Sequence, residues 1–117
     1  MSDLFKSIIG EQLSSVEFVQ DYLQLHFDGN VLTCYSWPKI HLLDVSFEFQ
    51  SNGYRDALCA FISRIVNRVN FEENKKLELF FETGYSITLD INRNEANVSL
   101  PEFAYFTSIE GEWFVLD

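Results

Sequence analysis

Apolar and polar residues alternate along much of the chain. Residues 22–27 place Leu23, Leu25 and Phe27 in alternate positions, and residues 77–81 do the same with Leu77, Leu79 and Phe81. Side chains on a strand point alternately to its two faces. Each of these two runs therefore predicts an antiparallel strand that buries one face.

Similar patterns predict further strands and two helices. The strands are expected at residues 16–19, 22–27, 31–37, 43–50, 104–107 and 112–116, and three more follow from the repeat described next. Helical spacing of Leu4, Phe5, Ile8 and Ile9 predicts a short first helix. A second helix is expected from about Gly53 to Val66, with Tyr54, Leu58, Phe61, Ile62 and Ile65 on its buried face.

Two stretches of the sequence resemble each other. Val66, Val69 and Phe71 stand where an earlier stretch has Leu13, Val16 and Phe18, and Thr83-Gly84 matches the hairpin turn Asp28-Gly29. The sequence thus predicts an internal duplication, with repeat 1 at about 2–50 and repeat 2 at about 53–117. Chance similarity between alternating strands is the alternative. The polar stretch 92–99 is expected to form a loop.

A chain of 117 residues suits a single domain, here 1–117. The predicted fold class is α+β, in which each repeat supplies a helix and a three-stranded antiparallel meander. One meander cannot bury its apolar face alone. The two copies are expected either to pack face to face or to form one mostly antiparallel sheet covered by the two main helices.

Charge narrows the range of partners. The formal net charge is −10, which disfavours nucleic acid and anionic membranes and favours a basic protein partner. Selection for solubility alone would explain the same charge. The chain has no apolar run long enough to span a bilayer and no basic segment at its start, so a cytoplasmic protein is expected.

Motifs of known chemistry are missing from the sequence. It has no phosphate loop, nucleophile elbow or dinucleotide fingerprint, and no Cys or His pair has metal-ligand spacing. Cys34 and Cys59 stand among apolar residues and are expected to be buried thiols. The sequence therefore predicts no cofactor and no metal, and it favours a binding protein over an enzyme.

Aromatic and acidic residues supply the candidate binding site. Interface hot spots combine rings with surrounding polar groups, and the candidates of this kind are Tyr35, Trp37, Glu72, Glu73, Glu78, Glu82 and Trp113. A small-ligand pocket or minor active site formed by His41, Asp44 and Arg55 is the first alternative. A structural homodimer that pairs aromatic strands such as 112–116 is the second.

Four stretches carry a resemblance to known proteins: IIGEQLSSVEFVQDYLQLHFDG, YSWP, GYRDAL and GEWFVLD. In these the chain resembles an uncharacterised family of small bacterial proteins with no assigned activity. Its size, acidity and α+β pattern are also similar to those of toxin-neutralising immunity proteins. That likeness implies a cytosolic inhibitor, and neither resemblance names a site residue.

Overall fold

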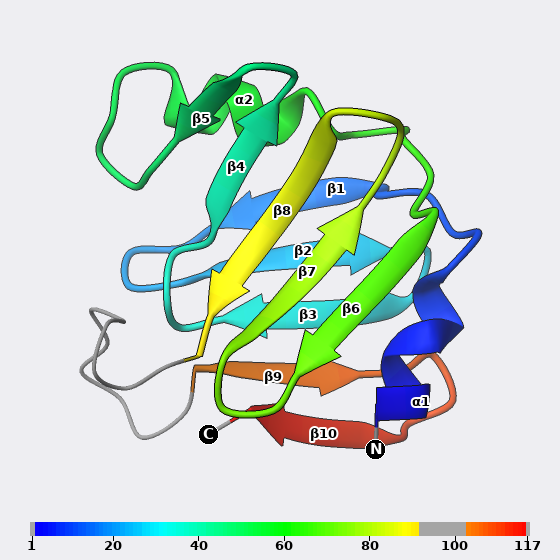
Figure 1. The fold of residues 1–117 in the computed structure, drawn as a ribbon. Coiled ribbons are helices and arrows are strands. Elements are labelled where there is room, and N and C mark those ends of the chain that lie inside the picture. The colour runs from blue at the N-terminus through cyan, green and yellow to red at the C-terminus, as the bar shows by residue number, and fades with distance from the viewer. Residues whose placement is uncertain (1, 92–102, 117) are drawn as a thin grey trace.

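Two five-stranded antiparallel sheets face each other in the computed structural model of the chain, which describes residues 2–91 and 103–116 (Figure 1). Sheet 1 has the order β1 (Ser15–Phe18), β2 (Leu23–Phe27), β3 (Asn30–Cys34), β9 (Ala104–Thr107), β10 (Trp113–Leu116). Sheet 2 has the order β5 (Val45–Phe47), β4 (Lys39–Leu42), β8 (Tyr85–Asp90), β7 (Lys76–Phe80), β6 (Arg68–Glu72).

The predicted α+β class with two main helices is wrong. The chain is 46% strand and 11% helical, a mostly antiparallel β fold. Its helical segments are α1 (Ser2–Phe5), the 3-10 turn η1 (Lys6–Ile8) and α2 (Tyr54–Cys59). These segments are too short to cover a sheet, so the sheets cover each other instead.

The second helix was predicted to run to Val66, yet it ends at Cys59. Ser63 has a φ of 80°, outside the helical range, and its N–H donates to the Leu13 carbonyl at 2.7 Å. Phe61 is still buried by the turn after the helix, which is why the helical spacing appeared to continue. Ile62 and Ile65, expected in the core, are exposed.

Only the middle of the strand predicted at 43–50 is confirmed, since β5 spans Val45–Phe47. Leu43 has a φ of 57° and lies in the tight turn between β4 and β5, where it is 66% exposed. The strand that pairs with β8 is formed by the preceding residues, Lys39–Leu42. The strands predicted at 16–19, 22–27, 104–107 and 112–116 are confirmed to within one residue at each end. The predicted 92–99 loop lies outside the described residues.

The core lies between the two sheets. Its largest fully buried side chains include Leu23, Leu25, Phe27 and Phe106 of sheet 1 and, from elsewhere in the chain, Phe5, Phe61 and Phe81. The Phe5 ring contacts the rings of Phe71, Phe106 and Phe114, so the first helical segment closes one side of the sandwich. Among the described residues, no helix is long and apolar enough to cross a membrane.

The two halves of the chain exchange hairpins. The β4–β5 hairpin of the first half pairs with β8 of the second, and the β9–β10 hairpin of the second half pairs with β3 of the first. Each sheet thus joins one half's three-stranded meander to the other half's hairpin. The predicted two-meander organisation takes this exchanged form, and strand pairing between the halves could not be read from local sequence.

Backbone hydrogen bonds link the two halves in reciprocal pairs. Gly10 N–H donates to the Val66 carbonyl, and Ser63 N–H donates to the Leu13 carbonyl. Gly10 and Ser63 are 53 positions apart, as are Leu13 and Val66, so one bond becomes the other when the halves are interchanged. The duplication itself stays a prediction, and this is the packing that two copies of one unit would adopt.

Candidate interaction surface

The outer face of sheet 1 carries an exposed aromatic cluster. Cross-strand register puts Val31, Thr107 and Trp113 in one row, and Tyr105 beside Val115 in the next. These five residues are called here the Trp113 face. Trp113 is 61% exposed, and its ring stacks on Tyr105 with centroids 6.3 Å apart. A contiguous exposed apolar patch is more informative than a single exposed residue, and the stacked rings with Val31 and Val115 form such a patch.

Two turns fix the end of the sheet that presents Trp113. Buried Asn30 accepts a hydrogen bond from the Ile109 N–H at 2.9 Å and donates one to the Phe27 carbonyl at 3.2 Å. Gly29 has a φ of 105°, and a Cβ there would lie 2.6 Å from Ile109 Cδ1. A side chain at position 29 would therefore push the two turns apart.

The turn that leads into β10 is held by Ser108. Its hydroxyl accepts hydrogen bonds from the N–H groups of Glu110 and Glu112, at 3.3 and 3.1 Å. Both glutamate side chains are exposed, beside Ile109, which is 67% exposed. The start of β10 is thus an ordered turn that presents acids next to Trp113.

Charge is distributed unequally between the sheets. Sheet 1 and its turns fall in residues 11–36 and 103–116, which contain six acids and no Lys or Arg. The acids are Glu11, Glu17, Asp21, Asp28, Glu110 and Glu112. His26 is the one base, with its Nε2 3.5 Å from a Glu17 carboxylate oxygen. The Trp113 face therefore has an uncharged centre and an acidic rim.

Sheet 2 presents a mixed outer face. Lys76 lies 3.5 Å from Glu78 and 3.9 Å from Glu72, and Lys39 lies 3.6 Å from Glu48. The Arg68 guanidinium sits 3.9 Å above the Phe80 ring. Because acids alternate with bases here, this face has little net field to attract a charged partner.

The structure distributes the four predicted acids over sheet 2 and its turns. Glu78 and Glu72 share Lys76, and Glu78 also accepts a hydrogen bond from Asn70 at 2.9 Å. Glu82 pairs with Arg64. Within the described residues, Glu73 makes no ion pair and is exposed in the β6–β7 turn. Three of the four acids are therefore already matched by a cation.

The predicted aromatic residues lie at two places. Tyr35 and Trp37 follow β3, at the end opposite Val31 and the row that holds Trp113. The Tyr35 ring lies 5.8 Å from that of Tyr22, and Trp37 stacks on Phe49 at 4.2 Å with the planes 6° apart. Trp113 is thus separated from the two aromatic residues with which it was grouped.

The three residues of the predicted pocket are not brought together. His41 Nδ1 lies 2.9 Å from the Ser46 hydroxyl and borders a hollow of about 420 Å³. Asp44 is exposed in the β4–β5 turn. Arg55 lines a separate hollow of about 450 Å³ formed by residues 49–56.

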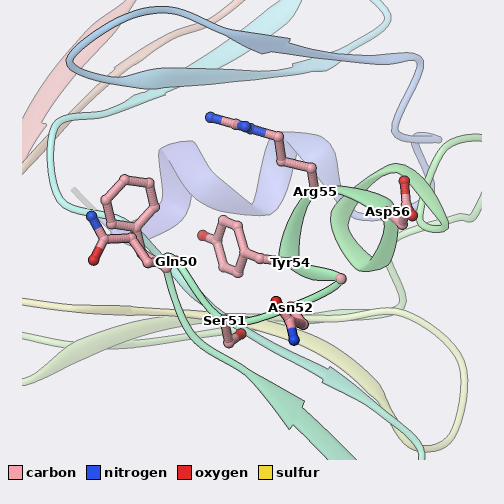
Figure 2. Close-up of a pocket in the computed structure, with 8 residues that line it drawn as sticks. Gln50, Ser51, Asn52, Tyr54, Arg55 and Asp56 are labelled. Carbon is pink, nitrogen blue, oxygen red and sulfur yellow. The ribbon is translucent and has the colours of Figure 1, made fainter.

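The hollow beside Arg55 is an open concavity. Figure 2 shows the Arg55 side chain extending above the Tyr54 ring, while Asp56 points away. The guanidinium lies 5.5 Å from the Phe18 ring, and the Tyr54 hydroxyl donates to the Pro38 carbonyl at 2.5 Å. Both polar groups are therefore engaged within the protein, and the hollow assembles no catalytic group.

Two buried groups have perturbed acidity, and both have structural causes. Burial raises the pKa of the Cys34 thiol to about 12, so Cys34 stays protonated and unreactive at neutral pH. Burial, followed by the influence of Cys34, also raises the pKa of Tyr54. Cys59, expected to be buried, is an exposed free thiol. No three His, Cys, Asp or Glu side chains of residues 2–91 and 103–116 form a group able to hold a metal ion.

Sequence reasoning missed the acidic rim of sheet 1. From the sequence, Asp28 and Glu110 were assigned to turns and Glu112 to the start of a strand, and none of the three was a candidate for binding. The signal was present, since two long segments contain no Lys or Arg. It could not be used until β9 and β10 were known to pair with the first meander.

No protein-family model, curated protein sequence or solved structure matches the chain. Inference about function therefore rests on the geometry and charge of the molecule itself.

Proposed function

We propose that the protein is a non-enzymatic binding module whose Trp113 face contacts a basic partner protein. The observation that carries the proposal is an exposed Trp113, stacked on Tyr105, in the sheet whose strands and turns (residues 11–36 and 103–116) contain acids and no Lys or Arg. An aromatic anchor within a polar rim is the usual composition of an interface hot spot.

The two features would act at different stages of binding. The acids of sheet 1 attract a positively charged partner over a distance set by ionic strength, which speeds encounter. Burial of Trp113 and its apolar neighbours then slows dissociation. Of the acids first predicted, Glu73 remains available for this role, while Glu72, Glu78 and Glu82 are paired with cations.

The compositional likeness to immunity proteins suggests one form of this function, a cytoplasmic inhibitor that covers a basic toxin. Tight inhibition would require a partner surface with a cleft for Trp113 and cations around it. Both the inhibitor role and the cytoplasmic location belong to the proposal.

Affinity capture from host lysate with three baits tests the function. The baits are the wild type, Trp113→Ala and Phe80→Ala, the last a matched ring deletion on sheet 2. We expect a basic protein to be retained by the wild type and Phe80→Ala, lost by Trp113→Ala, and released by high salt. Equal retention by all three baits would refute the Trp113 face as the binding surface.

A homodimer formed through β10 is a second candidate, favoured by the exposed position of this strand at the edge of sheet 1. It would bring Glu110 and Glu112 of two copies toward each other, and like charges oppose such pairing. Sedimentation at high protein concentration decides, since a monomer at low and high salt eliminates the homodimer.

A further inference from the structure

β10 forms an edge of sheet 1, and among the described strands only β9 pairs with it (Figure 1). Ser108 N–H donates to the Glu112 carbonyl at 2.7 Å. This bond shows which residues of β10 form their backbone hydrogen bonds with β9. Bonding directions alternate along an antiparallel strand. Trp113 and Val115 therefore direct their N–H and C=O groups away from β9, toward the side of β10 on which no strand of residues 2–91 and 103–116 pairs.

The other sheet edges carry features that discourage pairing. β1 contains Glu17, and Arg55 reaches over its Phe18 ring. β6 contains Arg68 and Glu72, and β5 spans only three residues. Charged residues and short length are the usual protection of an edge strand. β10 has four residues, Trp-Phe-Val-Leu, and no charge.

A hollow of about 60 Å³ lies along the inner side of β10. It is lined by Phe71, Glu73, Asn74, Ile91, Phe114, Val115 and Leu116. A strand added to β10 would direct alternate side chains toward this hollow and toward the outer face beside Trp113. The hollow is small and is lined by Glu73 and Asn74 beside apolar residues, so it would receive only the end of a side chain. A Lys or Arg whose tip reached it would bring its cation next to Glu73.

We propose that β10 accepts an extended basic segment of the partner as a sixth strand of sheet 1. This inference rests on the proposed function and specifies how the partner binds. Main-chain hydrogen bonds to Trp113 and Val115 supply affinity, and alternation of basic with apolar side chains supplies specificity. Charge selects this occupant, because the acids around β10 attract a basic segment and repel a second copy of the chain.

Amide hydrogen exchange on the isotope-labelled full chain tests the proposal. The probe is a synthetic peptide of about seven residues that alternates lysine and valine, long enough for one strand. The control peptide has the same sequence with alternate backbone amides methylated, so its charge is unchanged but it cannot pair as a strand. We expect the first peptide to slow exchange of the Val115 amide by about tenfold or more, and the control to have no effect.

Each other outcome contradicts strand addition at β10. These outcomes also show whether the proposed binding function fails with it. If both peptides shift the Trp113 resonances equally without protecting Val115, a partner docks on the face and no strand is added, so the proposed function survives alone. If neither peptide binds, or if the Val115 amide is already protected at high protein concentration and exposed on dilution, β10 does not take a basic segment. A Val115→Pro variant that stays folded should lose the protection that the first peptide gives to the Trp113 amide, because position 115 can no longer donate a hydrogen bond to an added strand. Val45→Ala, which shortens an exposed valine of β5 on sheet 2, should keep that protection.

Discussion

The two sheets are alike on their inner faces and different on their outer faces. Leu25 of sheet 1 and Leu79 of sheet 2 hold corresponding places in the two meanders, and both are buried. Outside, sheet 1 shows an uncharged aromatic centre with an acidic rim, whereas sheet 2 shows acids and bases in alternation. The shared core demands the same side chains from both sheets, and the solvent-facing sides are free to differ.

The difference between the two outer faces concerns charge and exposed rings more than stability. Exposed ion pairs such as Lys39–Glu48 contribute only about 0–1 kcal/mol each, so sheet 2 gains little stability from its pairs. The ion pairs instead reduce the electrostatic field outside sheet 2, because the paired acids are balanced by nearby bases. The acids of sheet 1 have no Lys or Arg beside them in that sheet. Trp113 is 61% exposed and adds little to the core, so removing its ring should cost little stability and report on the proposed binding role.

The largest expected effect tests whether the inner faces are equivalent. Leu25→Ala and Leu79→Ala each delete a buried side chain in the centre of a sheet. We expect each to lower the free energy of unfolding by about 2–5 kcal/mol, with similar values for the pair. Urea unfolding measures both. A loss under about 1 kcal/mol at one site only would show that the two sheets do not share one core.

The alternation of apolar and polar residues correctly predicted strands of the two meanders. The helical spacing of apolar residues did not correctly predict the extent of the second helix. Leu23, Leu25 and Phe27 alternate in sequence and are buried in β2 as expected. The 53–66 helix failed because Phe61 keeps helical spacing while it is buried by a turn, and periodicity cannot distinguish these cases. The strand at 43–50 is shorter than predicted because a residue without a turn signature, Leu43, adopts a positive φ in the β4–β5 turn.

The candidate surface was only partly predictable for a different reason. Trp113 was singled out from sequence, but its neighbours depend on the pairing of β9 with β3, a contact between distant segments. Glu72 and Glu78 were expected to be available to a partner, but Lys76 lies opposite Glu72 and on the same strand as Glu78 and is close to both carboxylates. Composition alone does not reveal which acids are neutralised.

The second effect compares one ring on each outer face. With the captured partner, Trp113→Ala should weaken binding by about 2 kcal/mol, close to thirtyfold, because a buried aromatic anchor is lost. Phe80→Ala should change affinity by less than about threefold. Calorimetric titration measures both dissociation constants. A larger loss of affinity in Phe80→Ala than in Trp113→Ala would contradict the assignment of binding to sheet 1.

A third effect concerns the one titratable side chain in the inner face of β3. Cys34 stands where the second meander has Leu89, and burial raises the pKa of its thiol from 9.0 to about 12. Above pH 9.0 the unfolded chain loses this proton while the folded chain keeps it. Stability should therefore fall as pH rises, by up to about 1.4 kcal/mol per unit.

The thiol dominates the window between pH 9.0 and 10.0, because the ordinary pKa of Tyr54, the other buried group, is 10.0. Urea unfolding across this window should show a slope in the wild type and in Cys59→Ala, whose thiol was exposed. Most of the slope should disappear in Cys34→Ala, and the remainder should come from Tyr54. A slope of wild-type size in Cys34→Ala would assign the alkaline sensitivity to another group.

The smallest effect compares acids of equal number on the two sheets. Glu110→Gln with Glu112→Gln removes two charges beside Trp113, and Asp44→Asn with Glu48→Gln removes two exposed charges from the β4–β5 hairpin of sheet 2. Both double variants change the net charge equally, so any difference reflects position. We expect the sheet 1 variant to slow association with the basic partner by a few-fold, about 1 kcal/mol or less, and to flatten its dependence on salt. The sheet 2 variant should change the rate less, because Asp44 and Glu48 belong to the other sheet and Glu48 already lies beside Lys39. Stopped-flow association rates over a series of salt concentrations make the comparison. Equal slowing by both variants would mean that the partner responds to total charge, and the acidic rim of sheet 1 would then have no directing role.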